Sequence, residues 1–194
     1  MTPIVILAIV GLIVAVIGFL VWRQWFETYH FAAVQEGVLY RDGNRGVREF
    51  ATMVRRVKPK TIVALVDDDE ITDAEKPEFK AEIEFAKQQG IPIERIPVKL
   101  GGWPSTEDVR RFLDIATDKT NQPVIVHCAQ GVRRTGMMAA AFQESVLGYD
   151  RDKTKSLILT FGHSERSIGD VKRFIDVYDP MKREVTQQLE QSKE

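Results

Sequence analysis

The sequence predicts an α/β fold in which a central, mostly parallel sheet is flanked by helices. Short apolar runs alternate along the chain with longer segments that carry apolar residues at helical spacing, which is typical of such a sheet. The run at 61–66 is continuously apolar, as expected of a strand covered on both faces. A separate uncharged run near the start predicts one N-terminal transmembrane helix ahead of this domain.

The expected elements follow from apolar spacing and from the glycines and prolines that interrupt it, among them Pro59, Gly90 and Gly148. The acidic stretch at 67–70 is expected to be a solvated loop. Ser167 and Asp170 are expected to cap the last helix. Strands are expected at 32–34, 38–40, 61–66, 91–98 and 123–128. Helices are expected at about 47–57, 75–89, 104–118, 134–147, 151–160 and 167–179.

The N-terminal apolar run, residues 3–22, is predicted to be an uncleaved membrane anchor. It has no charged residue over about 20 positions, which is enough for a helix to cross the hydrocarbon core. A cleaved signal peptide would need a basic segment before the run and a small-residue cleavage site after it, and neither is present. Trp22 and Trp25 are typical of the membrane interface. Basic residues only follow the run, which predicts a single-pass protein with its C-terminal domain in the cytoplasm: Arg23, Arg41, Arg45 and Arg48.

The rest of the chain is divided into a juxtamembrane linker at 23–30, one folded domain at 31–180 and a polar tail at 181–194. The 27 basic and 28 acidic residues nearly balance, which argues against a nucleic-acid partner. A single cysteine excludes an intrachain disulfide and a cysteine-rich zinc site, and the three histidines lack metal-ligand spacing. We therefore expect no metal and no cofactor.

The single cysteine, Cys128, stands where the strand at 123–128 runs into the next helix. Such a junction is an anion site, because the first helical N–H groups are unpaired and the helix dipole is positive there. In the stretch HCAQGVRRTG, Cys128 and Arg134 enclose five residues, a loop short enough to wrap one phosphoryl group. Gly131 lets the backbone approach closely, and Arg134 supplies a planar fork for two phosphate oxygens. The alternative is a buried, inert cysteine.

This stretch, His127–Gly136, resembles the signature of the cysteine-dependent protein tyrosine phosphatase superfamily. The signature is His-Cys, two residues, Gly, two residues, Arg, Ser or Thr, Gly, and every fixed position matches. The stretches GVLYRDG, TIVALV, IERIPV and DVKRFIDVY are similar to the small dual-specificity-like branch, so the resemblance covers about residues 31–180. It implies the fold of these phosphatases and hydrolysis of phosphomonoesters without a metal.

The resemblance also implies a role for each matching residue. Cys128 is the expected nucleophile, which forms a phosphocysteine, and Arg134 is expected to hold the phosphoryl oxygens. Thr135 is expected to stabilise the departing thiolate. His127 is expected to orient the loop and to help set the acidity of the thiol. The remaining residues of the expected phosphate-binding loop are Ala129, Gln130, Gly131, Val132, Arg133 and Gly136, the last packing the helix start against the sheet.

One part of the family pattern is missing. The family usually carries an aspartate about thirty residues before the cysteine, which protonates the leaving oxygen, but Lys99 and Leu100 stand in that region. Loss of such an acid costs about 10²–10⁴ in rate. Parallel strands share one functional edge, which suggests substitutes that follow the strand at 61–66: Asp67, Asp68 and Asp69. Glu107 and Asp108, expected in the following helix, are the next candidates.

The predicted function is therefore a membrane-anchored phosphatase that acts on phosphotyrosine, phosphoserine or phosphothreonine. An alternative from another class is a pseudophosphatase, which binds phosphoproteins without efficient turnover and is favoured by the missing aspartate. A third hypothesis makes a phosphorylated lipid or membrane metabolite the substrate. Arg133 would then be a second basic group at the pocket rim, whereas the alternative for Arg133 is a solvated surface residue. The expected partners are thus a phosphorylated protein, lipid or small molecule, and a membrane.

Overall fold

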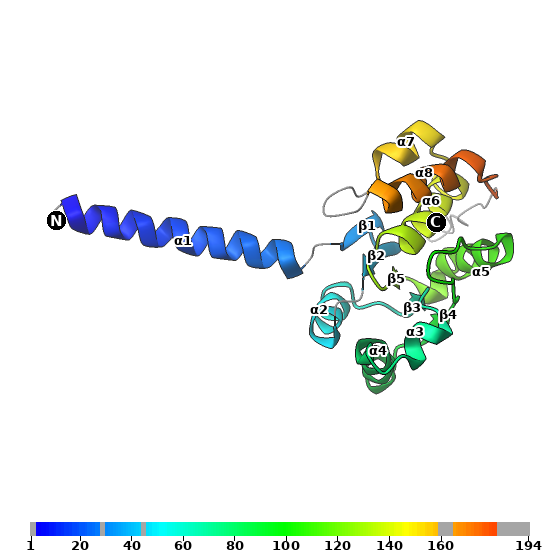
Figure 1. The fold of residues 1–194 in the computed structure, drawn as a ribbon, viewed down its shortest axis with the longest axis horizontal. Helices are drawn as coiled ribbons and strands as arrows, with labels where there is room; N and C mark the ends of the chain where they lie inside the picture. The colour runs from blue at the N-terminus through cyan, green and yellow to red at the C-terminus, as the bar shows by residue number, and fades with distance from the viewer. Residues whose placement is uncertain (1–2, 28–29, 44–45, 159–164, 182–194) are drawn as a thin grey trace, which may run out of the picture.

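One sheet contains the five strands found in the described part of the chain. The computed structural model describes residues 3–27, 30–43, 46–158 and 165–181 (Figure 1). The strands are β1 (Ala32–Gln35), β2 (Leu39–Gly43), β3 (Thr61–Ala64), β4 (Ile93–Arg95) and β5 (Val124–Cys128). Their order is β1-β2-β5-β3-β4, with β1 antiparallel to β2 and all other pairs parallel. The predicted, mostly parallel sheet is confirmed.

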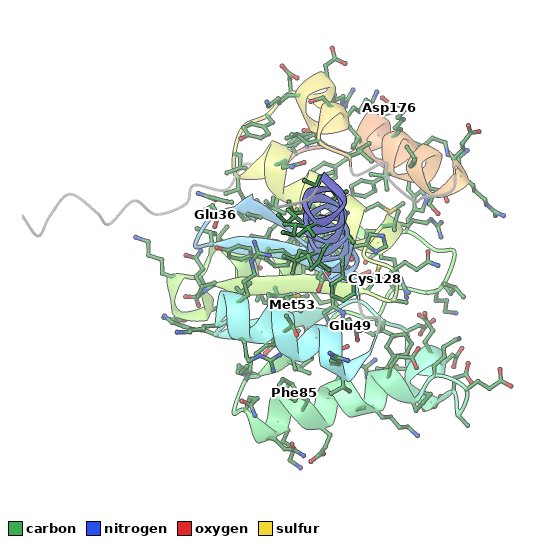
Figure 2. All side chains as sticks on the ribbon, turned by 90° about the vertical axis from the view of Figure 1, so that its left-hand side faces the viewer. Glu36, Glu49, Met53, Phe85, Cys128 and Asp176 are labelled. Atoms are coloured by element: carbon green, nitrogen blue, oxygen red, sulfur yellow. The ribbon has the colours of Figure 1, made fainter. Side chains whose placement is uncertain are left out.

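Helices cover both faces of this sheet. The helices of the described residues are α1 (Pro3–Glu27), α2 (Val47–Val57), α3 (Asp68–Thr72), α4 (Pro77–Gln88), α5 (Thr106–Thr117), α6 (Arg133–Ser145), α7 (Arg151–Ser156) and α8 (Glu165–Val177), with a 3₁₀ turn η1 (Lys119–Asn121). One core is shared with α2 and α4, and a larger core on the other face is shared with α5, α6 and α8. Figure 2 shows Met53 and Phe85 on one side of the sheet and Asp176 on the other.

Side chains of β5 alternate between these two cores, and this alternation decides where the motif residues lie. Val126 and Cys128 pack in the larger core with α5, α6 and α8. Ile125 packs in the smaller core with α2 and α4. His127 shares the face of Ile125, and the ring of Phe50 from α2 contacts the imidazole edge-on at a centroid distance of 5.8 Å. The histidine and the cysteine of the motif therefore point to opposite faces of the sheet.

Helix α3 occupies the acidic stretch that was expected to be a solvated loop, so this expectation is wrong. The carboxylate of Asp67 accepts a hydrogen bond from the N–H of Asp68 at 2.7 Å, and the carboxylate of Glu70 accepts one from the N–H of Asp67 at 3.1 Å. This reciprocal cap satisfies N–H groups that a helix start leaves unpaired. A helix of five residues is too short to show a hydrophobic period, which is why apolar spacing does not reveal it.

Other differences lie near the two ends of the domain. The predicted cap of Ser167 and Asp170 is wrong, because α8 already begins at Glu165 and both residues lie inside it. Helix α1 continues to Glu27, so residues 23–27 of the predicted linker are helical. Residues 28–29, Arg45, the segment 159–164 and most of the predicted tail, 182–194, lie outside the described residues.

No helix in the described part of the chain was found to be long and apolar enough to cross a membrane. The anchor at residues 3–22 stays a prediction. The large apolar side chains described in α1 are 43–67% exposed, and none of them belongs to either core. Every residue of the two cores lies between Phe31 and Met181. The domain therefore builds its hydrophobic core without α1.

A chain that lacks residues 1–26 should fold on its own for this reason, which thermal unfolding followed by circular dichroism can test. We expect one cooperative transition. Phe112→Ala should lower the free energy of unfolding of this chain by about 3–5 kcal/mol, because the ring is fully buried. Leu100→Ala, at a position 72% exposed, is the control and should change it by less than about 0.5 kcal/mol. A shortened chain without a cooperative transition would contradict the assignment of the core.

Candidate active site

The phosphate-binding loop joins β5 to α6 and contains the predicted motif. β5 ends at Cys128, four residues form the turn, and α6 begins at Arg133. The Cys128 side chain is 2% exposed, and Arg134 and Thr135 are buried beside it. The Arg134 guanidinium and the Thr135 hydroxyl both hydrogen-bond the Cys128 sulfur. The structure thus brings together the three residues that the motif singled out.

Two glycines let β2 and the phosphate-binding loop pack backbone against backbone. A Cβ atom on Gly43 would lie 2.5 Å from the carbonyl carbon of Gln130, and one on Gly131 would lie 2.6 Å from the amide nitrogen of Gly43. Gly131 also has a φ of 70°, in the left-handed region that favours glycine. Nη2 of Arg41, on β2, donates to the carbonyl oxygen of Gly131 at 2.8 Å. β2 therefore supports the loop directly.

The first turn of α6 is close-packed as well. A Cβ atom on Gly136 would lie 3.1 Å from Cγ2 of Val171 on α8. The same atom would lie 3.7 Å from Nη2 of Arg41. Gly136 thus packs the helix start closely against Val171 of α8 and against the Arg41 side chain of the sheet.

The surroundings of Cys128 favour its thiolate. Burial alone would raise the pKa of the thiol, but the Arg134 guanidinium, the Thr135 hydroxyl and the backbone N–H groups of Thr135 and Gly131 outweigh this effect. The pKa of Cys128 therefore lies below its ordinary value. Burial lowers the pKa of Arg41 to about 10, so Arg41 stays charged near neutral pH and supplies a second cation. A thiolate held in this way is a strong nucleophile.

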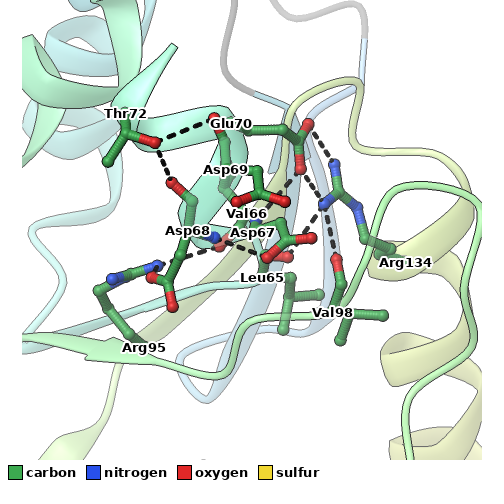
Figure 3. A network of polar contacts seen from close by, with 10 residues as sticks. All are labelled: Leu65, Val66, Asp67, Asp68, Asp69, Glu70, Thr72, Arg95, Val98 and Arg134. Atoms are coloured by element: carbon green, nitrogen blue, oxygen red, sulfur yellow. Dashed lines mark hydrogen bonds and ion pairs between the residues drawn. The ribbon is translucent and has the colours of Figure 1, made fainter.

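Arg134 is held by a buried carboxylate, Glu70 of α3 (Figure 3). Nη1 and Nη2 of Arg134 donate to Oε2 and Oε1 of Glu70 at 2.5 and 3.0 Å. Nη1 also donates to the carbonyl oxygens of Leu65 at 3.2 Å and Val98 at 2.9 Å. Burial opposes ionisation of Glu70, but the hydrogen bonds from Arg134 and from the N–H of Asp67 hold its pKa below the ordinary value. These contacts orient the guanidinium through its Nη atoms.

His127 lies on the other face of the sheet. Its side chain is 1% exposed, and Nε2 lies 2.6 Å from Oε1 of Glu82 on α4, whose side chain is 3% exposed. Burial opposes protonation of the imidazole, but the charge and hydrogen bond of Glu82 hold the pKa of His127 above its ordinary value. His127 therefore faces a carboxylate and not the phosphate-binding loop.

Arg133 is not a solvated surface residue, so this interpretation is wrong, and its expected place at the pocket rim stays a prediction. Its Nε atom lies 2.7 Å from Oδ2 of Asp170 on α8, and its Nη2 atom donates to the carbonyl oxygen of Gly101. Asp170 also pairs with Arg173. Arg133 thus joins the start of α6 to α8 and to the loop that follows β4.

The candidate proton donors are engaged in other contacts or exposed. Asp67 caps α3, Asp68 lies 2.6 Å from Nη2 of Arg95, and the side chain of Asp69 is exposed. Glu107 and Asp108 lie in the first turn of α5, as predicted, where Glu107 pairs with Arg110 and Asp108 forms a reciprocal cap with Ser105. Only Glu70 of the acidic stretch contacts Arg134. Within the described residues, no group of three or more His, Cys, Asp and Glu side chains is arranged to hold a metal ion.

Comparison with known proteins identifies the family of this chain. A family model described as "DSP-PTPase phosphatase fused to NAD+ Kinase" matches residues 34–176. The chain belongs to this family. It is therefore a phosphatase of the cysteine-dependent protein tyrosine phosphatase superfamily, as the motif predicts.

Relatives of this phosphatase are known from plants and yeast. Probable NAD kinase 2, chloroplastic, of Oryza sativa subsp. japonica is 30% identical over 97 residues, which are 50% of this chain and 10% of that protein. Inositol diphosphatase DSP2 of the same plant is 28% identical over 120 residues, which are 59% of this chain and 53% of that protein. The chain thus spans between about a tenth and about half of the length of these relatives. The catalytic core of the PP-IP phosphatase SIW14 from S. cerevisiae has the same fold, with a TM-score of 0.62 and 20% identity over 77% of this chain and 85% of that chain.

The phosphatase also uses charged side chains that lie outside the motif and that the sequence analysis missed. Glu70 stands three residues after Asp67, the spacing of a reciprocal helix cap, and this was a signal for α3. Glu82 stands at helical spacing with Phe79 and Ala86, which are both buried, so it is a carboxylate on an apolar helix face. No such sequence signal marks Asp170 as the partner of Arg133.

Gly43→Ala should displace the phosphate-binding loop without unfolding the domain. The added Cβ atom meets backbone atoms of Gln130, which cannot rotate away as a side chain could. We expect kcat/KM for an aryl phosphate to fall by about 10²-fold, the effect of a misplacement of about 1 Å. Gly169→Ala in α8 is the matched control, because nothing lies within 4 Å of its Cβ position. Unchanged kcat/KM in Gly43→Ala would contradict the role of the backbone contact.

Glu70→Gln should release Arg134, because it removes the charge that holds the guanidinium. We expect kcat/KM to fall by roughly 10²-fold and the free energy of unfolding at pH 7 to fall by about 3 kcal/mol. The pKa of Glu70 is lowered in the folded state, so its stabilisation is present above the ordinary carboxyl pKa of about 4.3 and is lost as the pH falls through the folded value. The difference in Tm between wild type and variant should therefore shrink at acidic pH. Glu75→Gln is the control, because Glu75 is exposed and lies three residues after the end of α3.

Proposed function

We propose that this phosphatase hydrolyses phosphate groups whose leaving group can depart without a proton donor, through a phosphocysteine at Cys128. The observation that carries this proposal is the composition of the loop at 96–105. Arg134 donates to Val98 and Arg133 to Gly101, so this loop lies against the phosphate-binding loop, yet it contains no carboxylate. The nucleophile and the phosphate cradle are complete, whereas the family's usual acid is absent from its place.

The reaction takes two steps. The Cys128 thiolate attacks phosphorus while the bond from phosphorus to the leaving oxygen breaks, and the leaving group departs with the bonding electrons. Arg134 and the N–H groups of the loop bind the nonbridging oxygens throughout. Water then attacks the phosphocysteine, phosphate is released, and the Thr135 hydroxyl stabilises the thiolate that departs.

The leaving group decides the rate of the first step. A proton donor contributes about 10²–10⁴ in rate, and this help matters most for alkoxides, which carry negative charge poorly. Aryl oxides, and phosphate expelled from a phosphoanhydride, depart as stable anions. One similar protein is named an inositol diphosphatase and another a PP-IP phosphatase. These names support a diphosphate group on a small polyanion as the substrate, and the leaving-group argument favours aryl phosphates such as phosphotyrosine over phosphoserine and phosphothreonine.

Steady-state rates on a series of aryl phosphates, an inositol diphosphate and a phosphoserine peptide test the proposal. We expect a steep dependence on the pKa of the leaving group, and at least about 10²-fold slower hydrolysis of phosphoserine. Because the pKa of Cys128 is lowered, kcat/KM should rise with pH through a value below the ordinary thiol pKa and then stay level. Cys128→Ser should abolish turnover. A shallow leaving-group dependence would contradict the proposal and require an acid.

Variants of the three aspartates of the acidic stretch test whether one of them donates a proton to the leaving group. If one of Asp67, Asp68 and Asp69 donated the proton, its change to Asn would slow phosphoserine hydrolysis by roughly 10²-fold and aryl phosphate hydrolysis much less. We expect no such difference for any of them.

A phosphate-binding pseudophosphatase is the second candidate, and the missing acid favours it. Tight binding of vanadate without turnover of any substrate would support it. The lipid hypothesis rests on the predicted anchor and on Arg133, and the pairing of Arg133 with Asp170 weakens the second of these grounds. Vesicles that contain phosphoinositides complete the substrate panel.

We also propose that residues 3–22 anchor the chain in a membrane, with the domain at 31–180 in the cytoplasm. Two observations support this. Ten large apolar side chains of α1, between Val5 and Leu20, are exposed and belong to neither core. The basic residues near the run all follow it, which favours a cytoplasmic domain.

Extraction of membranes at alkaline pH tests the anchor. The full-length chain should stay in the membrane pellet, and a chain lacking residues 1–26 should be released. Protease added to intact cells should leave the domain uncut. Release of the full-length chain would contradict the anchor, and cleavage from outside would contradict its orientation.

A further inference from the structure

A buried ion pair lies on the face of the sheet opposite to Cys128. Nε2 of His127 and Oε1 of Glu82 are 2.6 Å apart, and both side chains are at most 3% exposed. Phe79 and Ala86, the neighbours of Glu82 on the inner face of α4, are buried as well. Phe50 of α2 contacts the imidazole edge-on. The two charged groups therefore meet beside buried apolar side chains of α2 and α4.

Burial of such a pair costs free energy, because charged groups lose their hydration among apolar side chains. An isolated carboxylate at this position would lose its hydration without compensation. An imidazole that carries a proton compensates for this loss, and the Glu82 charge does hold the pKa of His127 above its ordinary value in spite of burial. The other charged groups that act on His127 are the Cys128 thiolate and Asp42 of β2, and both favour the imidazolium.

His127 is covalently next to the nucleophile and is fixed between two strands. It lies opposite Asp42 of β2 and Ala64 of β3, and its carbonyl oxygen accepts a hydrogen bond from the N–H of Leu65 at 2.9 Å. A ring that is anchored to α4 limits rotation of the peptide between His127 and Cys128. The imidazolium is also a positive charge one residue from the thiolate, on the side that Arg134 does not cover.

We propose that Glu82 is a positioning residue of this phosphatase, which holds His127 as an imidazolium. The imidazolium fixes the end of β5 that carries Cys128 and places a positive charge near the Cys128 thiolate. This inference rests on the proposed function only in taking Cys128 as the nucleophile. In this arrangement Glu82 acts through its contact with His127.

The test uses the full-length protein with Glu82→Gln, which removes the charge and keeps the shape. Cys128 is the one cysteine of the chain, so its alkylation by iodoacetamide can be followed by mass spectrometry without turnover. We expect alkylation at pH 6 to be about tenfold slower, which corresponds to a rise of one unit in the thiol pKa. kcat/KM should fall at the same pH and recover as the pH rises, with little change in KM. Glu84→Gln, two residues along α4 and exposed, is the matched control and should change neither quantity.

His127→Asn provides the second variant. It should shift the pH profile of alkylation as Glu82→Gln does, and the double variant should shift it no further, because both changes remove the same pair. The raised pKa of His127 means that the pair stabilises the fold below the ordinary histidine pKa of about 6.5, and that this stabilisation is lost as the pH rises through the folded value. The difference in Tm between wild type and His127→Asn should therefore shrink at alkaline pH.

Two results would overturn the inference. One is an unchanged pH profile of alkylation in both Glu82→Gln and His127→Asn, even with a lower Tm, because the pair would then be only structural. The other is additive shifts in the double variant. Absence of turnover in the wild type would contradict the proposed function and would leave the alkylation test valid.

Discussion

The thiolate that is favoured at Cys128, the proposed nucleophile, lies at a position that is 2% exposed to solvent, and the arrangement of the surrounding groups follows from this burial. An anion withdrawn from water is costly unless positive charge and hydrogen-bond donors replace its hydration. The turn from β5 into α6 provides N–H groups, Thr135 provides a hydroxyl, and Arg134 provides the charge. The close contact of Gly43 with Gly131 then lets the loop keep this shape against the end of β2.

The basic side chains of the motif are themselves paired, each with a carboxylate from a different helix. The pairs are His127 with Glu82 of α4, Arg133 with Asp170 of α8, and Arg134 with Glu70 of α3. Without these partners, three cations close to one loop would repel one another. Two of the three helices, α3 and α4, belong to the crossover between β3 and β4 that parallel strands require. The same connection therefore builds the sheet and orients the groups that surround the phosphate.

The sequence predicted the sheet, the helices on its faces and the cysteine loop well, because each depends on residues that are close together in the chain. Apolar spacing identifies the strands and α6, and a fixed spacing of six positions relates Cys128 to Arg134. The carboxylates were missed, because Glu70 meets Arg134 across 64 positions of sequence and no local pattern relates residues so far apart. The same limit explains why the ion pair of Arg133 was not predicted: its partner, Asp170, lies on a helix whose placement depends on the whole fold.

Cys128 is the single cysteine of these 194 residues, and this also determines how the site responds to oxidants. Peroxide reacts with thiolates, so the groups that favour catalysis also favour conversion of Cys128 to a sulfenic acid. Many redox-sensitive cysteines are then protected by a disulfide with a neighbouring cysteine, but these 194 residues contain no second one. Rescue must come from a thiol outside these residues that is small enough to reach a buried sulfur, as glutathione is. Until such a thiol arrives, a second oxidation to the sulfinic acid would make the loss of activity permanent.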